Sequence, residues 1–422
     1  MEPLSGPVQH YAWGSTTAIP ALLGIPADGR PHAELWLGTH PSAPAMLASG
    51  GLDAAVEVDP SVLGEESVQR FGPQLPYLMK ILAADRALSL QAHPTRAQAE
   101  AGFAAEEAAG VSRTDPARNY KDAWPKPEIL CALGDFEALY GFADPAVVAE
   151  HFMRLGVVEL TDLVAPLTTP GGAAGIEQVF LTLCGLPESE RGVVERVAAA
   201  AQDVTEDGPY GTWCRTAVEL AEQYPGDPGV IAALLMNRMS LVAGEAIYLP
   251  AGNLHAYLRG VGVELMANSD NVLRGGLTPK HVDVTELGRV LDFSPVGPAV
   301  VPTELEVPGV VRYVTPAPEF RLWRIELDSA GTVAVPASRY GRIVLGIGGE
   351  AALTAHDGRA SEASVSRPAS ASRPASVSRP ASASRPPGRL TLASGQAAWI
   401  PAGEEVTVSG QGLAFVAAPG LD

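Results

Sequence analysis

One twelve-residue pattern occurs twice in this chain. Residues 244–255 read GEAIYLPAGNLH, and residues 395–406 read GQAAWIPAGEEV. In both copies a short apolar segment runs into a Pro-Ala-Gly turn, where glycine can take backbone angles that other residues avoid, and a second segment leaves the turn. The recurrence predicts two related β-units within one chain.

The two copies differ three residues beyond the glycine of the turn. His255 stands there in the first copy and Val406 in the second. Because valine has no ligand atom, a metal site at this position could exist only in the first unit. We therefore expect the second unit to be free of metal and to serve as a packing partner for the first.

The stretch from Asp144 to about Asn237 has a helical period instead. Asp144-Pro145 and Asp227-Pro228 each offer an N-cap followed by proline at the first helical position. Residues 193–202, VVERVAAAAQ, and residues 215–224, RTAVELAEQY, have amphipathic 3.6-residue spacing. We interpret this stretch as a helical domain inserted into the first β-unit.

The length of 422 residues is too great for one small core, since domains average roughly 150 residues. Short β-rich patterns with such turns, and a histidine on the outgoing strand, resemble the cupin barrel of the jelly-roll class. The expected fold is therefore mainly β, with an inserted α-helical domain and two cupin-like (jelly-roll) β-barrels. The expected domains are a catalytic cupin domain at 1–140 plus 238–310, the helical domain at 141–237, and a C-terminal cupin-like domain at 311–422.

A low-complexity insert interrupts the second β-unit at about residues 358–388. It repeats Ser-Arg-Pro-Ala-Ser-(Ala or Val) with a period of six, and it has no aromatic side chain that could join a core. Such a composition predicts an extended, mobile loop. We expect the loop to be dispensable, and a basic arm for an acidic partner is the alternative. Six arginines lie in or beside it: Arg359, Arg367, Arg373, Arg379, Arg385 and Arg389.

The net charge of −19 argues against nucleic acid or an anionic membrane as a partner. The longest apolar run, around 229–236, is far too short to span a bilayer, and residues 1–15 lack the features of a secretory signal. These features predict a cytoplasmic protein. The three cysteines, Cys131, Cys184 and Cys214, are odd in number and widely spaced, which indicates reduced core thiols.

The segment SLQAHP, residues 89–94, predicts a strand with one polar face. Ser89, Gln91 and His93 point to one side, while Leu88, Leu90 and Ala92 point to the other. A strand of this kind either has a solvated face or lines a polar cavity. The segment alone does not choose between these two interpretations.

Two further segments carry groups that could join a metal site. Lys126 and Glu128 flank Pro127 at the expected start of a strand, and His255 and Tyr257 alternate onto one face of LHAYL. Two imidazoles, a carboxylate and an amide oxygen form a reasonable ligand set for a divalent ion, with zinc favoured. Ordinary hydrogen-bonded histidines inside a barrel are the alternative.

The segment ELMANSDNVLRGGLTPK, residues 264–280, offers an anion site. Thr278-Pro279 has the pattern of a helix N-cap and first helical residue, and Arg274 and Lys280 flank it. Free N–H groups at a helix start, beside two cations, would bind phosphate. A surface helix cap with incidental charges is the alternative.

Taken together, these segments resemble the type I phosphomannose isomerases, zinc enzymes that interconvert mannose 6-phosphate and fructose 6-phosphate. The similarity covers most of the first 290 residues, whereas the tail resembles only the second cupin domain of the family. It runs through VQHYAWGS, AELWLGTHPSAPA, LPYLMKILAADRALSLQAHP, KPEILCALGDFEALYGF and LHAYLRGVGVELMANSDNVLRGGLTPK.

The resemblance implies one zinc ion per chain and a small sugar phosphate as substrate. It implies roles for matching residues: Gln91, His93, Glu128 and His255 as zinc ligands, Arg274, Lys126, Glu264 and Tyr257 as catalytic residues, and Ser89, Lys280 and Asp270 as substrate-binding residues. The reaction would pass through an enediol, with Glu264 or Lys126 as the base. We expect a monomer.

Two positions depart from the family pattern. Trp124-Pro125 replaces Asn-His, and Leu254 replaces a proline, so the local shape of the cavity rim is in question. Two other functions compete with the isomerase. A metal-dependent cupin oxygenase would use two histidines and a carboxylate but not the cationic loop, and a non-catalytic sugar-binding bicupin would need neither.

Overall fold

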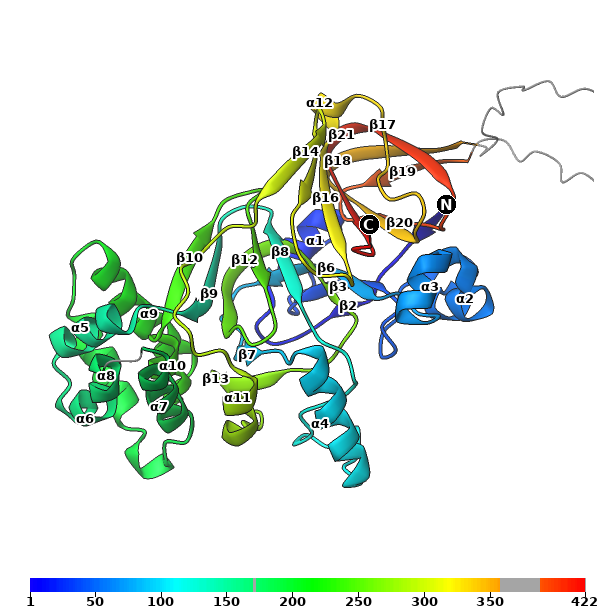
Figure 1. Ribbon diagram of the computed structural model, residues 1–422. Helices are drawn as coiled ribbons and strands as arrows, with labels where there is room; N and C mark the ends of the chain where they lie inside the picture. The colour runs from blue at the N-terminus through cyan, green and yellow to red at the C-terminus, as the bar shows by residue number, and fades with distance from the viewer. Residues whose placement is uncertain (170–171, 357–387, 422) are drawn as a thin grey trace, which may run out of the picture.

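The computed structural model describes residues 1–169, 172–356 and 388–421. Two large antiparallel sheets dominate it, and a group of helices lies at one end (Figure 1). Within the described residues the first sheet has ten strands: β2 (Val8–Gln9), β3 (Glu34–Gly38), β6 (Tyr77–Ala84), β7 (Leu90–Ala92), β8 (Glu128–Ala132), β9 (Phe136–Phe142), β10 (Met236–Leu241), β11 (Ala246–Leu249), β12 (His255–Ala267) and β13 (Leu273–Gly276).

The second sheet belongs almost entirely to the C-terminal part of the chain. Only β1 comes from the N-terminus, and it pairs with β20 at the edge of the sheet. The nine strands described are β1 (Glu2–Leu4), β14 (Thr303–Val307), β15 (Val310–Tyr313), β16 (Arg321–Glu326), β17 (Val333–Ala334), β18 (Arg342–His356), β19 (Arg389–Ala393), β20 (Ala397–Ile400) and β21 (Glu405–Ala418). A separate hairpin joins β4 (Met46–Leu47) and β5 (Gly50–Gly51).

Strand β12 connects the two halves of the first sheet. Its first part pairs with β7 and β9, and its second part, from Gly260 on, pairs with β6 and β8. Gly260 has φ +124°, and a Cβ there would lie 2.6 Å from the ring of Phe136, so a side chain would not fit. This change of partners places His255 and Glu264, on one continuous strand, beside different neighbours.

Helices α5 to α10 lie between β9 and β10 in the sequence, and these two strands are antiparallel neighbours in the sheet. Figure 1 shows this group, α5 to α10, at the far end of the first sheet. The helices are α1 (Ala18–Leu23), α2 (Leu52–Val58), α3 (Glu65–Phe71), α4 (Arg96–Ala108), α5 (Pro145–Leu155), α6 (Thr161–Val164), α7 (Ala173–Cys184), α8 (Val193–Gln202), α9 (Pro209–Gln223), α10 (Gly229–Ala233), α11 (Val284–Val290) and α12 (Leu327–Ala330).

Local signals predicted several of these helices well. The amphipathic segment 193–202 is helix α8, and 215–224 falls in α9 except for its last residue. Asp144 caps α5 as predicted, since its side chain accepts a hydrogen bond from the N–H of Ala146. The expectation for Asp227-Pro228 is wrong by one position: Pro228 is the N-cap residue of α10.

The repeated twelve-residue pattern forms the same local structure twice. In the first copy β11 leads into the turn and β12 leaves it, and in the second β20 leads in and β21 leaves. The turn glycines, Gly252 and Gly403, have φ of +79° and +80°. The prediction of two related strand-turn-strand units is confirmed.

The two sheets pack against each other through one apolar core. It contains side chains of both sheets, including Met79 and Leu265 from the first and Trp399 and Phe415 from the second. The hydroxyl of Tyr77 also crosses this boundary, because it donates to the carbonyls of Gly341 and Ala417 at 3.1 and 3.0 Å. The second sheet thus packs on the first, as we expected.

The predicted insert at 358–388 lies outside the described residues except for Gly388. Its flanks pair with each other: β18 and β19 are antiparallel partners, with Thr354 opposite Arg389, and the N–H of Ala355 donates to the carbonyl of Gly388 at 2.9 Å. The insert therefore joins two strand ends that already lie side by side.

Two expectations about the whole chain can be compared with the described residues. The three cysteines are free thiols, as predicted, although Cys184 is only partly buried. Among the described helices, none has both the length and the apolar character needed to cross a bilayer.

Candidate active site

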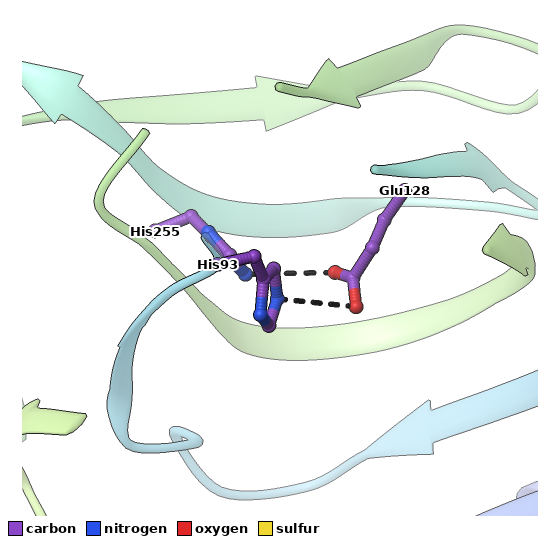
Figure 2. Close-up of side chains that lie close together, drawn as sticks. All are labelled: His93, Glu128 and His255. Atoms are coloured by element: carbon purple, nitrogen blue, oxygen red, sulfur yellow. Dashed lines mark ion pairs between the residues drawn. The ribbon is translucent and has the colours of Figure 1, made fainter. Parts of the chain in front are cut away.

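His93, Glu128 and His255 meet in the interior of the first sheet (Figure 2). Nε2 of His93 lies 3.2 Å from Oε1 of Glu128, and Nε2 of His255 lies 3.5 Å from Oε2 of the same carboxylate. All three side chains are almost fully buried. Two imidazole nitrogens and a carboxylate that converge in this way are a suitable donor set for a divalent metal ion.

The backbone orients both imidazoles toward the carboxylate. Nδ1 of His93 is 2.8 Å from the carbonyl oxygen of Asn271, and Nδ1 of His255 is 3.1 Å from that of Asn253. A carbonyl only accepts, so each Nδ1 carries the proton and each Nε2 keeps a free lone pair. Nε2 of His93 is buried and has no hydrogen-bond partner in the described part of the chain, so the site fits a metal ion.

Protonation agrees with this arrangement. Burial lowers the pKa of His93 to about 4, and Lys126 adds to the effect, so the imidazole is neutral at neutral pH. Burial by itself would raise the pKa of Glu128, but Lys126 and His93 hold it well below its ordinary value. The pair therefore offers a neutral imidazole and a carboxylate, the forms in which these groups bind metal.

Gln91 lies beside this cluster through strand register. On β7 it is directly opposite His255 of β12 on one side and Arg274 of β13 on the other. Directly opposite residues of antiparallel strands share a face of the sheet. His93, two positions along the chain, shares that face as well. The polar face of this predicted strand therefore lines a cavity and is not an open, solvated surface.

The cavity next to the cluster has a volume of about 470 Å³. Six of the predicted site residues form part of its wall: Ser89, Gln91, Lys126, Asp270, Arg274 and Lys280. Lys126 reaches from this wall to Glu128, with Nζ 3.0 Å from Oε1. The cavity thus joins the metal-type cluster to a wall whose cationic side chains include Lys126, Arg274 and Lys280.

The local structure at Lys280 differs from the prediction. Thr278 and Pro279 lie in a bent loop, and helix α11 begins at Val284 with Asp283 as its N-cap. The N-cap pattern was misleading because the Thr278 hydroxyl oxygen accepts from the N–H of Lys280, two residues on, which closes a turn and not a helix. The cations Arg274 and Lys280, and not a helix terminus, therefore supply the positive charge at this part of the wall.

Glu264 and Tyr257 lie behind the cavity wall. Oε2 of Glu264 is 2.8 Å from Nζ of Lys80, which does line the cavity. The Tyr257 ring packs edge-on against Phe136, and its hydroxyl has no hydrogen-bond partner among the described residues. Burial raises the pKa of Tyr257 well above its ordinary value, and the negative charge of Glu264 adds to the effect.

Known proteins match both the sequence and this structure. Residues 1–144 match the model of the phosphomannose isomerase type I catalytic domain. The chain is 38% identical to the mannose-6-phosphate isomerase of Salmonella typhimurium over 70% of its own length and 75% of that protein, and 30% identical to the human mannose-6-phosphate isomerase over 78% and 83%.

The chain belongs to the type I phosphomannose isomerase family. As a member of this family it is an isomerase. Solved structures of phosphomannose isomerases agree over the whole fold: the zinc-bound form superposes with a TM-score of 0.83 at 31% identity and covers 100% of this chain and 99% of that one. A variant of the Salmonella typhimurium phosphomannose isomerase gives a TM-score of 0.84, with both chains covered completely.

Sequence reasoning missed two charged residues and a tryptophan in this cavity. Glu34, Trp36 and Lys80 all line it. The indole N–H of Trp36 donates to Oε2 of Glu34 at 2.7 Å, and Nζ of Lys80 lies 3.4 Å from Oε1 of Glu34. A signal was present, because Lys80 is the one charged residue in the otherwise apolar segment YLMKILAA of β6, and a buried lysine needs an acidic partner.

His40 is a second residue that the sequence analysis missed. Its Nε2 lies 3.1 Å from Oδ1 of Asp270, and both residues line the cavity. Burial alone would raise the pKa of Asp270, but the contact with His40 holds it below the ordinary value. His40 falls within the family-like segment AELWLGTHPSAPA, so that segment was the available signal.

The two departures from the family pattern lie outside the cavity wall. The Trp124 ring packs against the guanidinium of Arg96, 4.9 Å from the ring centre, and against Phe71. Leu254 is fully buried in the apolar core beneath β7 and the helices. Neither residue is among those that line the cavity, so the side chains at these positions do not shape its rim.

Proposed function

We propose that this chain interconverts mannose 6-phosphate and fructose 6-phosphate with the aid of one zinc ion. The observation that supports this proposal best is the pair of histidines with free Nε2 atoms around Glu128, beside a cavity whose wall carries Arg274 and Lys280. Its relatives are named for the substrate, and one relative is described as zinc-bound.

The metal would be held by His93, Glu128 and His255, with Gln91 as the fourth ligand. The buried lone pair on Nε2 of His93 and the backbone-fixed tautomers support this assignment. When bound, zinc would polarise the sugar carbonyl and orient its neighbouring oxygen. The two histidines contribute because backbone carbonyls already orient their rings, so that binding costs little rearrangement.

The phosphate would lie against Arg274, Lys280 and Ser89. Two cations and a hydroxyl suit a phosphate dianion through charge-assisted hydrogen bonds. Burial lowers the pKa of both Arg274 and Lys280, and it also strengthens their attraction for an anion in the cavity. Asp270, fixed by His40, would accept hydrogen bonds from sugar hydroxyls.

The isomerisation moves a proton from carbon 2 to carbon 1 through an enediol. Of the two candidate bases, Lys126 lies in the cavity wall, whereas Glu264 lies behind it beside Lys80. We assign the proton transfer to Nζ of Lys126, which alone of the two reaches the cavity. It would accept the proton as a neutral amine, the form that the charge of a bound metal ion beside it favours. Glu264 and Glu34 would hold the charge of Lys80 in place, so that this cation stabilises the negative enediolate.

The finer description of the fold belongs to the same proposal. We propose that the two sheets are cupin-like jelly rolls, with domains at 1–140 plus 238–310, 141–237 and 311–422, and that the helices between β9 and β10 form the inserted domain. The buried Tyr257 would support the ring of His255, 6.3 Å away. We propose a cytoplasmic monomer that acts on a small sugar phosphate.

A coupled assay tests the proposed function. Fructose 6-phosphate formed from mannose 6-phosphate is measured with and without a chelator, and we expect turnover that the chelator removes and zinc restores. Oxygen consumption without isomerisation would favour the oxygenase, and sugar binding without turnover would favour the binding protein.

Isotope exchange tests the assignment of the base. We expect Lys126→Met to abolish exchange of the carbon 2 hydrogen with solvent while the sugar phosphate still binds. Glu264→Gln is expected to slow turnover and keep measurable exchange. Exchange that persists in Lys126→Met and disappears in Glu264→Gln would transfer the role to Glu264.

A further inference from the structure

The turn between α9 and α10 contacts two separate segments of the cavity wall. On one side, the side-chain carbonyl of Gln223 accepts from the N–H of Ala87 at 2.8 Å, and its backbone carbonyl accepts from the guanidinium of Arg86 at 2.9 Å. The hydroxyl of Tyr224 donates to the carbonyl of Ala87 at 2.5 Å. These contacts hold the segment that leads directly to Ser89.

On the other side, Asp227 holds the loop that carries Lys280. Its Oδ1 accepts from the N–H of Gly229 at 2.7 Å, and its Oδ2 accepts from the N–H of Thr278 at 2.9 Å. The Thr278 hydroxyl oxygen in turn accepts from the N–H of Lys280 at 3.1 Å. One carboxylate therefore ties the start of α10 to the backbone of the cationic loop.

The two backbones touch at this point with no room for side chains. A Cβ on Gly229 would lie 2.5 Å from the amide nitrogen of Leu277, and a Cβ on Gly276 would lie 2.5 Å from Cα of Gly229. Leu277 has φ +55°, a left-handed conformation that costs free energy for a leucine and persists only where its surroundings enforce it. The turn supplies that enforcement through the Asp227 contact and the close glycine packing.

We propose that the turn at residues 223–229 is a positioning element for the phosphate end of the substrate, and that Asp227 is its main positioning residue. The turn spans the two wall segments that carry Ser89 and Lys280, and it sets their separation. Asp227 acts through the backbone of Thr278 and does not itself line the main cavity. This inference rests on the proposed function, because it assigns the phosphate to that wall.

Asp227→Asn provides a test in which two explanations predict opposite changes in the affinity for phosphate. If Asp227 were merely a nearby negative charge, its removal would strengthen the binding of a phosphate. If Asp227 is a positioning residue, its replacement weakens phosphate binding. The amide nitrogen of asparagine cannot accept from an N–H, so one of the two backbone hydrogen bonds is lost. We expect KM for mannose 6-phosphate to rise about tenfold, with kcat changed by less than about threefold.

Asp144→Asn is the matched control. Asp144 also precedes a proline at the start of a helix in the same part of the chain and also accepts from a backbone N–H, but that N–H belongs to Ala146 of its own helix, α5. We expect this variant to have unaltered KM. An equal rise in KM for both variants would mean a general loss of helix stability and would overturn the inference.

Gly229→Ala tests the same contact without a change of charge. The added methyl group must push the amide of Leu277 away, so we expect KM to rise in this variant too. Gly192→Ala, at the start of α8, is its control, because its Cβ would meet only the tip of the Arg196 side chain at 3.4 Å. Should Asp227→Asn fail to fold, the Gly229→Ala result decides, and an unchanged KM overturns the inference.

Calorimetry with inorganic phosphate separates this inference from the proposed function. If the unaltered chain does not isomerise mannose 6-phosphate, the proposed function fails, and phosphate binding still tests the turn. Weaker phosphate binding in Asp227→Asn, with the zinc content and melting temperature of the unaltered chain, supports the inference. Equal or tighter binding, or no binding of phosphate by the unaltered chain, overturns it.

Discussion

Lys80 and Glu264 face each other across strands β6 and β12, with Nζ 2.8 Å from Oε2 and only 7% and 3% of their side chains exposed. Burial alone would lower the pKa of Lys80, but Glu264 and Glu34 raise it above its ordinary value. Burial raises the pKa of Glu264, and the attraction of Lys80 offsets only part of this because Glu128 and Glu34 add negative charge nearby. Lys80 therefore pairs with two carboxylates, Glu34 and Glu264, and one lysine cannot neutralise both.

The raised pKa of Glu264 predicts a particular pH dependence of stability. Above the ordinary glutamate pKa of 4.5, the unfolded chain has lost this proton while the folded protein still holds it, so the contribution of Glu264 to stability falls as pH rises. Glu264→Gln cannot titrate. We therefore expect the unfolding free energy of the unaltered chain, minus that of the variant, to decrease from pH 4.5 toward neutrality.

Urea denaturation at several pH values measures this difference. Comparison of this variant with the unaltered chain cancels the titration of groups that lie far from Glu264. A difference that grows with pH would show that Lys80 dominates over burial and that the pKa of Glu264 is lowered.

The metal site predicts the behaviour of two variants. His255→Ala and Glu128→Ala each remove one of the converging donors. We expect both variants to lose tightly bound zinc and activity together, because residues that only hydrogen-bond to the ligands cannot replace a missing ligand. Metal analysis after dialysis and the isomerase assay are the measurements. His281→Ala, a change at an exposed histidine outside the cluster, is the control. Stoichiometric zinc and near-normal turnover in either ligand variant would contradict the assignment.

Arg274→Ala is expected to damage mainly the use of the phosphorylated sugar. The guanidinium lies in the cavity wall opposite Gln91, and loss of its charge-assisted contact should reduce kcat/KM on the order of ten to a hundredfold. Arg289→Ala, at an exposed arginine of α11, should leave kcat/KM unchanged. Turnover of unphosphorylated mannose as fast as its phosphate would refute the anion site even before any variant is made.

We expect deletion of the insert to leave stability and activity nearly unchanged. Because β18 and β19 are already paired at Thr354 and Arg389, a short Gly/Ser turn in place of residues 359–387 can close the hairpin, and loop-closure entropy changes slowly with length. We expect the unfolding free energy to change by about 1 kcal/mol or less. Thermal denaturation and the isomerase assay check this. A tenfold loss of kcat/KM at an unchanged melting temperature would show that the insert reaches the cavity.

Local patterns were enough to predict the parts of the site that lie within single strands. The alternation around Gln91 and His93, and the start of a strand at Glu128, follow from spacing, because side chains on a strand alternate between its two faces. The turn glycines Gly252 and Gly403 were equally readable, since few other residues adopt their backbone angles. At Thr278-Pro279 the local pattern failed, because a hydroxyl can close a turn as readily as it can cap a helix.

The sequence by itself determined which chemical groups this protein has and on which strand face each of them stands. Only the tertiary structure decided which of them meet. The carbonyl of Asn271 selects the tautomer of His93 from 178 positions away, and Lys80 finds Glu264 through the pairing of β6 with β12. Asp227 reaches Thr278 through the close packing of two glycines. Periodicity reports the surroundings of a residue within its own element, whereas such contacts depend on strand register and on the packing of distant segments.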